Sequence, residues 1–495
     1  MQYTWVGVAY LLTQTALQPL YGRVSDLIGR KAVLHASILV FAVGSLLCGA
    51  AQSAKWLIGA RALAGMGAGG IVSAVWVITS EIVEEQHRAK WSQALSITWG
   101  ASAVAGPLLG GVFSGHQGKG IVSWRWGFYI NLPICAVAVV IITLTLRNIR
   151  LARDSDASFR RFLGRFDFGG LILFVGGSGC IVVGFGLASD TGWSSPPTLV
   201  GIILGAILLV AAGIWECYTK RECLFPPTMF RKPTAVFVLV ISFLHYFAFT
   251  SGTFYLALFY QAANGSTPLQ AGIKMLPYSL GASMASMPAA WFMTAWQQRT
   301  GNTSGQKAII STGLFVCTVG FGLLNLLHEN SSLASQVLYP LVAGIGIGML
   351  FHSPYQVFCK AITPAELATG TSAFFLTRFT GTTIGLAASG AIFSARSRGR
   401  LPTGLPLNGS GHSIHYSALI HLQPEELKRQ VLMIVASSIR TIWTVCTPLL
   451  GISLLMSFLL RSMPVETSAT PPHTTARTTS DSTSTSHKGE LTGAV

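Results

Sequence analysis

The sequence predicts an all-α integral membrane protein, and three observations carry this prediction. The chain of 495 residues is 51% hydrophobic and only 10% charged, whereas soluble proteins contain roughly 25% charged residues. Its apolar residues gather in runs long enough to cross about 30 Å of hydrocarbon. It also contains 53 glycines, which are frequent where helices pack closely inside a bilayer. A soluble domain with so few charges could not avoid large apolar surface patches.

The apolar runs predict about 13 transmembrane helices. In chain order they are expected at residues 3–20, 33–51, 56–79, 92–113, 126–146, 169–188, 198–217, 234–259, 272–296, 307–327, 334–358, 368–395 and 441–461. The resulting units are an N-terminal bundle at 1–146, two linking helices with their loops at 147–233, a C-terminal bundle at 234–462 with a long loop at 396–440, and a tail at 463–495. Because the tail is rich in Ser, Thr and Pro, it is expected to be disordered in the cytosol.

Charge in the loops predicts the orientation. The net charge of +16 lies in short clusters between apolar runs, which fits lipid headgroups better than nucleic acid. Basic residues follow the first, third, fifth and seventh spans, as at Lys31 and Arg147. By the positive-inside rule these loops are cytosolic and the loop 396–440 lies outside. Asn408 opens an N-x-S sequon in that outer loop and is a candidate for glycosylation.

The loop after the first span carries the first motif. Residues 22–31 place Gly22 and Gly29 for turning, with Asp26, Arg30 and Lys31 close enough to pair. An ordinary positively charged loop is one interpretation. The spacing G-x3-D-x2-G-R-K is more specific than such a loop requires.

The third span carries the second motif. Arg61, Gly65 and Gly69 are spaced by four residues and so share one stripe of a helix. An arginine this far inside a span either reaches out to the headgroups or faces the protein interior. Because a stripe of small residues marks a packing face, the interior position is favoured.

The fourth span carries the third motif, in which Gly106, Pro107, Gly110 and Gly111 form a small-residue face. Proline removes one amide donor and bends a helix, and the glycines allow a neighbouring helix to approach closely. Tight packing alone would explain this face.

These three motifs, their order and the entry to the fifth span at residues 124–133 resemble the major facilitator superfamily. The two helices between the bundles and the long loop 396–440 resemble its fourteen-helix drug:proton antiporter branch, of the fungal multidrug and toxin efflux type. The resemblance implies a major facilitator fold of two six-helix pseudo-repeat bundles with two linking helices. Against the family pattern the chain starts at the second helix, so the first helix is expected to be absent.

The resemblance also implies roles for the motifs. Asp26 with Arg30 and Lys31 would be a cytosolic latch, although Leu27 stands where the family usually has a basic residue. Arg61 would tune the coupling of protons and substrate. The face formed by Gly106, Pro107, Gly110 and Gly111 would seal the cavity against leak. In the second half, residues 299–301 before Lys307 are similar to a degraded copy of the first loop, as an internal repeat predicts.

Some polar residues within spans are further candidates. Glu81 and Lys274 lie near span ends, where an interfacial position explains them most simply. His245 and His352 are single histidines, for which hydrogen bonding inside the bundle is one interpretation and a coupling role is the other. Arg378 lies about ten residues into its span, so it is expected to face the interior and to act in transport or coupling. No deep carboxylate is evident that would carry the proton.

The favoured function is secondary active transport, by proton-coupled antiport, of small organic or hydrophobic compounds out of the cell. The alternatives are a vacuolar transporter of basic amino acids and a non-transporting membrane sensor. No Walker loop or nucleophile–base arrangement occurs, so an enzyme is not expected. The expected partners are a small-molecule substrate, protons and the lipid bilayer, with no nucleic acid, cofactor or metal. We expect a monomer, in the plasma membrane rather than the vacuolar membrane.

Overall fold

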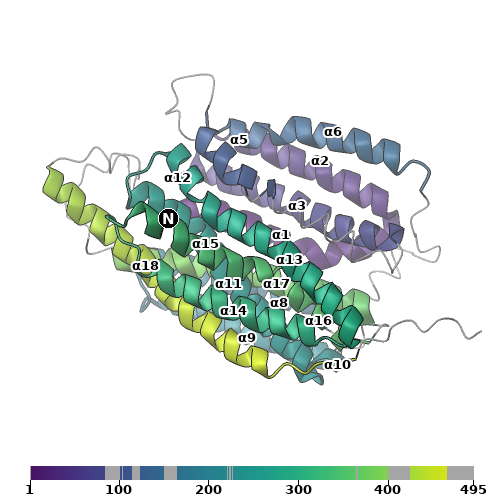
Figure 1. Cartoon of the computed structure of the whole chain (residues 1–495). Coiled ribbons are helices and arrows are strands. Elements are labelled where there is room, and N and C mark those ends of the chain that lie inside the picture. Colours follow the sequence, from purple (N-terminus) through teal and green to yellow (C-terminus); the bar gives the residue numbers. More distant parts are fainter. Residues whose placement is uncertain are drawn as a thin grey trace, which may run out of the picture.

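The computed structural model describes residues 2–83, 98, 101–102, 104–113, 123–149, 164, 166–219, 221, 224–225, 227–363, 366–397, 400 and 424–464. Each expected span is mostly helix over its described residues (Figure 1), but the expected span 334–358 is divided by a turn at residues 350–352. The helices are α1 (Gln2–Ile28), α2 (Arg30–Gly49), α3 (Ala54–Ile82), residues 104–113, α5 (Trp126–Tyr129), α6 (Asn131–Thr145), α8 (Phe168–Thr191), α9 (Pro196–Tyr218), α10 (Pro227–Phe230), α11 (Pro233–Ala262), α12 (Pro268–Lys274), α13 (Leu276–Thr300), α14 (Ser304–Leu324), α15 (Leu333–Met349), α16 (Ser353–Ala361), α17 (Leu367–Ser397) and α18 (Glu425–Phe458).

Nine helical segments in the described part of the chain are long and apolar enough to cross a membrane. The long helices α1, α13 and α17 are less apolar because they carry polar side chains that other helices cover. Gln14 and Thr15 of α1 and Arg378 of α17 are all buried, at 9% exposed or less. The polar faces of α1 and α17 therefore lie in the interior of the molecule, whereas α13 also exposes large apolar side chains such as Met284 and Trp291.

The last span begins earlier than expected. Helix α18 starts at Glu425, not near residue 441, so part of the expected loop 396–440 is helix. The reason is an amphipathic pattern in which Val431, Val435 and Ile439 are all fully buried, preceded by two acidic residues in the first turn. The helix is 34 residues long and extends past the neighbouring helix ends in Figure 1.

The helices form two groups, with α1 between them. Helices α2, α3, α5 and α6, purple to blue in Figure 1, lie together on one side, and α11 and α13–α18 make up the other. Helix α1 packs against α3 in the first group and α17 in the second. Between α1 and α17 the hydroxyls of Thr15 and Thr383 are 3.3 Å apart, and a Cβ at Gly7 would lie 2.8 Å from the Leu386 side chain.

Glycines bring α1, α2 and α3 into backbone contact. A Cβ added at Gly65 would lie 2.2 Å from the Tyr10 carbonyl oxygen of α1, and one at Gly69 would lie 2.8 Å from that of Gln14. On the opposite side of α3, a Cβ at Gly67 would lie 2.3 Å from the Phe41 nitrogen of α2. No residue larger than glycine fits at such distances without moving the backbone. The expected packing stripe therefore faces α1.

The turn between α1 and α2 is shorter than expected. Helix α1 continues through Gly22 to Ile28, and the chain turns at Gly29, whose φ is 96°. The prediction that Gly22 serves a turn was therefore wrong. At the matching place in the second group, α13 ends at Thr300 and Gly301 follows with a φ of 63°. Only glycine adopts such positive φ values at little cost.

Two buried carboxylates fasten the linking hairpin of α8 and α9. Asp167 caps α8 by accepting from the Gly170 amide at 3.1 Å, and both its oxygens lie 3.0 Å from Trp215 Nε1. The Glu216 carboxylate accepts from the amides of Leu224 at 3.0 Å and Phe225 at 3.4 Å. These bonds satisfy the buried acids and hold the start of the connection to α11. Helix α8 also packs against α17.

Candidate functional site

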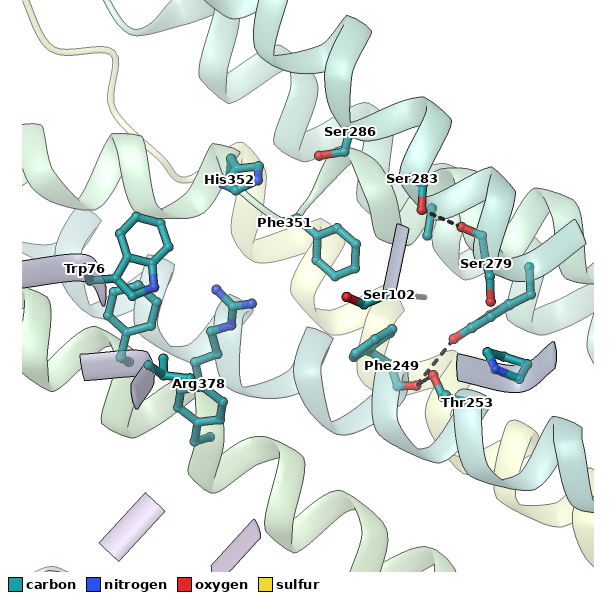
Figure 2. A pocket seen from close by; sticks show the side chains of 16 residues that line it. Trp76, Ser102, Phe249, Thr253, Ser279, Ser283, Ser286, Phe351, His352 and Arg378 are labelled. Carbon is teal, nitrogen blue, oxygen red and sulfur yellow. Dashed lines mark hydrogen bonds between the residues drawn. The ribbon is translucent and has the colours of Figure 1, made fainter. Parts of the chain in front are cut away.

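A cavity of about 340 Å³ lies where both groups of helices meet (Figure 2). Its volume is within the range of roughly 300–1,000 Å³ that small-molecule sites occupy. It is lined from α3, from Ser102 and Pro107, and from α11, α13, α17 and the turn before α16. The described lining residues are Val72, Trp76, Ser102, Pro107, Phe249, Thr253, Tyr278, Ser279, Ala282, Ser283, Ser286, Phe351, His352, Phe375, Arg378 and Phe379.

Arg378 provides the permanent charge of this cavity among its described lining residues. The residue is 9% exposed, and its Cζ lies 4.1 Å from the centre of the Tyr246 ring on α11. In Figure 2 its guanidinium points into the space between Trp76, His352 and Phe351. A guanidinium over an aromatic face is stabilised by the ring quadrupole. The expected interior position of Arg378 is confirmed, and its role in transport stays a prediction.

Glycines of α17 hold Arg378 against α11. A Cβ at Gly381 would lie 2.4 Å from the Phe243 carbonyl oxygen, and one at Gly385 would lie 2.7 Å from that of Phe247. This close backbone approach explains how Arg378, one turn before Gly381, is brought over the face of Tyr246. The pairing joins residues more than a hundred positions apart, so the sequence alone could not identify it.

Aromatic rings form much of the cavity wall. The ring centroids of Trp76 on α3 and Phe375 on α17 are 5.3 Å apart, which places side chains of both helix groups in contact. Phe249 of α11 meets Phe351 edge to face at 5.5 Å. Such pairs favour tilted or edge-to-face geometry and add to the stability from burial. The wall can therefore hold a flat apolar compound.

Hydroxyl groups of α13 line another part of the cavity. Ser283 donates to the Ser279 carbonyl at 2.9 Å, and Tyr278 donates to the Phe249 carbonyl at 3.3 Å. The Ser286 hydroxyl is buried and has no hydrogen-bond partner among the described residues. The sequence analysis missed these serines. Their spacing along one face of the span at 272–296 was the signal that could have revealed them.

Of the two single histidines, one lines the cavity and the other lies behind its wall. His352 is a lining residue. His245 is fully buried, with its ring 4.8 Å from that of Tyr246. A coupling role for either histidine stays a prediction.

Arg61 lies between helices but is not one of the described residues that line the cavity. Its Nε donates to the Val6 carbonyl at 3.1 Å, its Cζ lies 4.1 Å from the centre of the Tyr10 ring of α1, and Phe128 is 6.0 Å away. The guanidinium is thus held against protein groups, as the interior interpretation predicts. Its proposed influence on coupling would have to pass through α1.

The proline–glycine segment contacts α12 on one side. A Cβ at Gly111 would lie 2.7 Å from the Pro268 carbonyl oxygen, and one at Gly272 would lie 2.4 Å from that of Pro107. Cβ atoms at Gly106 and Gly110 would meet no described atom within 4 Å. Gly111 therefore acts in packing, whereas a sealing role for the whole face stays a prediction.

Two of the three charged residues of the expected cytosolic latch have partners among the described residues. Arg30 Nε lies 2.8 Å from the Glu81 carboxylate at the end of α3, and an Arg30 amino group donates to Ser25 at 2.6 Å. Lys31 donates to the Leu146 carbonyl after α6. The side chain of Asp26 lies outside the described part of the structure. Glu81 is thus a partner of this loop, which sequence reasoning had placed simply at the membrane interface.

A bundle of apolar helices around a cavity that both halves line defines a multi-pass membrane transporter. Residues 1–386 match the Major Facilitator Superfamily, and the chain belongs to this family. The predicted family and fold are thereby confirmed. Asn408, the glycosylation candidate, lies outside the described residues.

Several fungal relatives are similar over most of the chain. An uncharacterized transporter of Schizosaccharomyces pombe is 31% identical over 469 residues, which are 94% of this chain and 76% of that protein. Efflux pump FUS6 of Gibberella fujikuroi is 27% identical over 93% of this chain and 82% of its own length. Efflux pump dotC of Dothistroma septosporum is 30% identical over 79% of this chain and 64% of its own length.

Solved transporter structures share the fold at low sequence identity. A bacterial homologue of the human lysosomal transporter Spinster, in an inward-facing and occupied conformation, has a TM-score of 0.54 and 16% identity, over 93% of this chain and 94% of that one. A bacterial homologue of the human drug peptide transporters PepT1 and PepT2 has a TM-score of 0.56 and 14% identity, over 93% and 90% of the two chains. At such identities the likeness shows the fold alone.

Proposed function

We propose that this protein exports small organic or hydrophobic compounds by proton-coupled antiport and alternating access. The observation that carries the proposal is the cavity shared by both helix groups, which has aromatic walls and a buried arginine. A site built from both halves can open to either side when the halves move relative to each other. The relatives named as efflux pumps support the direction of transport.

The cavity favours this function over transport of basic amino acids. A cationic amino acid would require carboxylates, whereas the described lining residues include an arginine and no acid. Like charges in a cavity of low dielectric repel strongly. A sensor built on the same fold remains the second alternative, and a transport measurement separates it from an exporter.

The test is uptake into liposomes that contain the full chain and an acidic lumen. Proton efflux would drive an antiporter substrate inward. We would compare 6-hydroxy-2-naphthamide, 6-hydroxy-2-naphthoate and arginine, with a proton ionophore as control. Ionophore-sensitive accumulation of a naphthalene compound is expected. The naphthoate is informative because a weak acid distributes passively toward the alkaline side, opposite to antiport.

Two other results would replace the proposal. Accumulation of arginine without the naphthalene compounds would favour the basic amino acid transporter. Failure to accumulate any compound, by protein that is folded and binds one of them, would favour the sensor. Comparing plasma-membrane and vacuolar-membrane vesicles from cells that express the chain would then test the proposed plasma-membrane location.

For the coupling residues, we infer that Arg378 acts directly at the cavity and Arg61 acts through α1. An Arg378→Gln variant should lose transport of compounds that depend on the charge. An Arg61→Ala variant should lose uphill transport while keeping the binding of compounds in the cavity. Equal loss of binding in both variants would contradict this division, because Arg61 is not one of the described lining residues.

A further inference from the structure

We infer that a groove between α18 and the connection from α14 to α15 binds a zwitterionic phospholipid, with the lipid phosphate at Arg440 and the lipid amine at Glu329. Three observations carry this inference: the position of the groove at the membrane surface, the two charges in it, and an exposed stripe of α18 that continues from it. The inference does not depend on what the central cavity transports.

The groove is separate from the central cavity and has a volume of about 490 Å³, within the range of small-molecule sites. The connection from α14 to α15 contributes His328 and Glu329 to its lining. The residues that α18 contributes are Gln430, Met433, Ile434, Ser437 and Arg440. They belong to the first part of α18, which extends past the neighbouring helix ends in Figure 1.

The charge pattern of α18 places the groove at the membrane surface. Residues 441–460 contain no Asp, Glu, Lys or Arg, and Arg440 and Arg461 stand at the two ends of this run. A helix needs about 20 such residues to cross about 30 Å of hydrocarbon. Arg440 therefore lies at the level of the lipid headgroups, and the earlier residues of α18 lie farther from the hydrocarbon.

Contacts between α14 and α18 place the connection at the same level. Helix α14 ends at Leu324. The Thr444 hydroxyl of α18 donates to the Asn325 side-chain oxygen at 2.8 Å, and the Asn325 amide group lies 3.3 Å from the Thr447 hydroxyl. The chain after Asn325 thus lies beside the turn of α18 that contains Arg440, which explains why Glu329 and Arg440 line one groove.

The groove carries one charge of each sign from Arg440 and Glu329. Neither side chain has an ion-pair partner among the described residues. A guanidinium can bind a phosphate through two parallel hydrogen bonds, and a carboxylate attracts an amine. A zwitterionic headgroup supplies both partners together. An anionic headgroup would place its excess negative charge near Glu329, so it should bind less well.

An exposed stripe of α18 leads from the groove toward the hydrocarbon. Residues spaced by three and four positions share one face of a helix. At this spacing after Arg440 the exposed residues are Thr444, Pro448, Ile452 and Leu455. Helix α14 adds exposed apolar side chains at Phe315 and Val319. Acyl chains can lie along these apolar residues while the headgroup occupies the groove, which favours a lipid over a soluble ligand.

The test is native mass spectrometry of the purified full chain in detergent. The probes are phosphatidylcholine, phosphatidylethanolamine and the anionic phosphatidylglycerol, each with two oleoyl chains and supplied in equal amounts. At pH 8 a histidine is ordinarily uncharged. The complexes with either zwitterionic lipid should exceed those with phosphatidylglycerol by about threefold or more, as expected for one exposed charge contact. Equal binding, or a preference for phosphatidylglycerol, would overturn the inference.

Variants assign the two contacts. Arg440→Gln should reduce binding of all three lipids by about threefold or more, and Glu329→Gln should remove the discrimination against phosphatidylglycerol. Arg429→Gln and Glu426→Gln are matched controls, because both residues are exposed on α18 and do not line the groove. Unchanged discrimination in Glu329→Gln, or equal losses in Arg429→Gln and Arg440→Gln, would overturn the inference.

A further variant keeps the test decisive if Arg440→Gln does not fold. Arg440→Lys keeps the charge but lacks the planar fork, so it should retain only part of the binding. Full wild-type binding of all three lipids by this variant would contradict a bidentate contact with the phosphate.

A soluble competitor tests whether the ligand is a lipid. Glycerophosphocholine has the headgroup of phosphatidylcholine without its acyl chains. An excess of this compound should displace little of the bound lipid, because the chains supply apolar contacts along α14 and α18. Complete displacement would show a site for a soluble phosphodiester and would overturn the assignment to a phospholipid.

Discussion

Helices α1–α3 and α13–α15 are packed by the same arrangement of glycines. In the first unit, a Cβ at Gly65 would lie 2.2 Å from the Tyr10 carbonyl oxygen, and in the second, a Cβ at Gly344 would lie 2.2 Å from that of Tyr278. The segment Gly65-x-Gly67-x-Gly69 of α3 corresponds to Gly344-x-Gly346-x-Gly348 of α15. The internal repeat of the two units is therefore recognised by their close backbone contacts rather than by similar loop sequences.

The other side of the middle helix repeats as well. A Cβ at Gly67 would lie 2.3 Å from the Phe41 nitrogen of α2, and one at Gly346 would lie 2.3 Å from the Cys317 nitrogen of α14. In return, Gly44 of α2 faces Ala64, and Gly320 of α14 faces Ala343. Each unit thus joins three helices through glycines on two faces of one helix. The side chains of Phe41 and Cys317 differ in size, but in both cases the backbone nitrogen is the atom closest to the facing glycine.

The two units have different residue types at one equivalent position. Four residues before Gly65 the first unit has Arg61, and four residues before Gly344 the second has Pro340. Because proline has no amide hydrogen, the Gln336 carbonyl one turn earlier is left without its helical donor. The Tyr260 hydroxyl of α11 donates to it at 2.7 Å. The comparison shows that the glycine packing is shared between the two units, whereas a charge at this position occurs only in the first unit.

The largest expected effect comes from filling the shared contacts. Gly65→Val and Gly344→Val should each cost about 3 kcal/mol of stability, because overpacking at 2.2 Å must displace backbone. Thermal unfolding in detergent measures the change. Gly59→Val on α3 and Gly322→Val on α14 are matched controls, since their Cβ atoms would meet no described atom within 4 Å. An equal loss of stability in the control variants would mean that the close glycine contacts do not contribute to stability.

A smaller effect is expected where the second unit has its proline. Tyr260→Phe should cost about 2 kcal/mol, because it leaves the buried Gln336 carbonyl without a donor. Adding Pro340→Ala should recover most of this loss by restoring the helical amide. A double-mutant cycle of unfolding free energies measures the coupling. Strictly additive losses would show that the hydroxyl does not replace the missing amide.

At the corresponding position of the first unit, Arg61→Lys should cost about 1 kcal/mol and only partly restore the uphill transport lost in Arg61→Ala. Lysine keeps the charge but lacks the planar fork that both covers the Tyr10 ring and reaches the Val6 carbonyl. Uptake driven by a pH gradient, with matched amounts of protein, measures the second part. Wild-type uptake by Arg61→Lys would instead indicate a side chain that only reaches the headgroups.

The smallest effect is expected at the loops after α1 and α13, which have different contacts in the two units. Arg30 pairs with Glu81 at 2.8 Å in the first unit, whereas in the second the Thr303 amide donates to the Met463 carbonyl at 3.0 Å. Glu81→Gln should cost only about 0.5 kcal/mol, since both side chains are partly exposed. The loss should shrink further in high salt, and insensitivity to salt would argue against an ionic contribution.

The parts of the fold that could be predicted depend on local patterns. Apolar runs locate the helices, and Arg378 can be placed inside because a charge within a span seldom faces lipid. The stripe of Gly65 and Gly69 correctly indicated a packing face, but the second face at Gly67 was missed because it alternates with the first. The bulk of the cavity was also missed, since Trp76 and Phe375 meet only after distant helices have packed.

Errors at the loops have a different physical origin. Gly22 was expected to turn the chain, but one glycine with positive φ is enough, and Gly29 supplies it. The partner of Arg30 could not be predicted because Glu81 is 51 residues away and becomes adjacent only through the contact of α2 with α3. The early start of α18 was overlooked because its first part is amphipathic rather than uniformly apolar.

Under the proposed alternating access, the contact between α1 and α17 is one of the contacts that would change when the halves move relative to each other. Its hydroxyl pair, Thr15 and Thr383, is 3.3 Å apart, so that contact amounts to about 1 kcal/mol or less. Gly7 lets the flexible end of Leu386 lie close to α1, and such a side chain can change rotamer while a neighbour slides. Contacts of this kind allow shear motion, in which packed helices slide by small steps and exchange one set of weak side-chain contacts for another. Under the proposed alternating access, resistance to movement would then arise at the firmly fastened ends of the helices instead of along their middle.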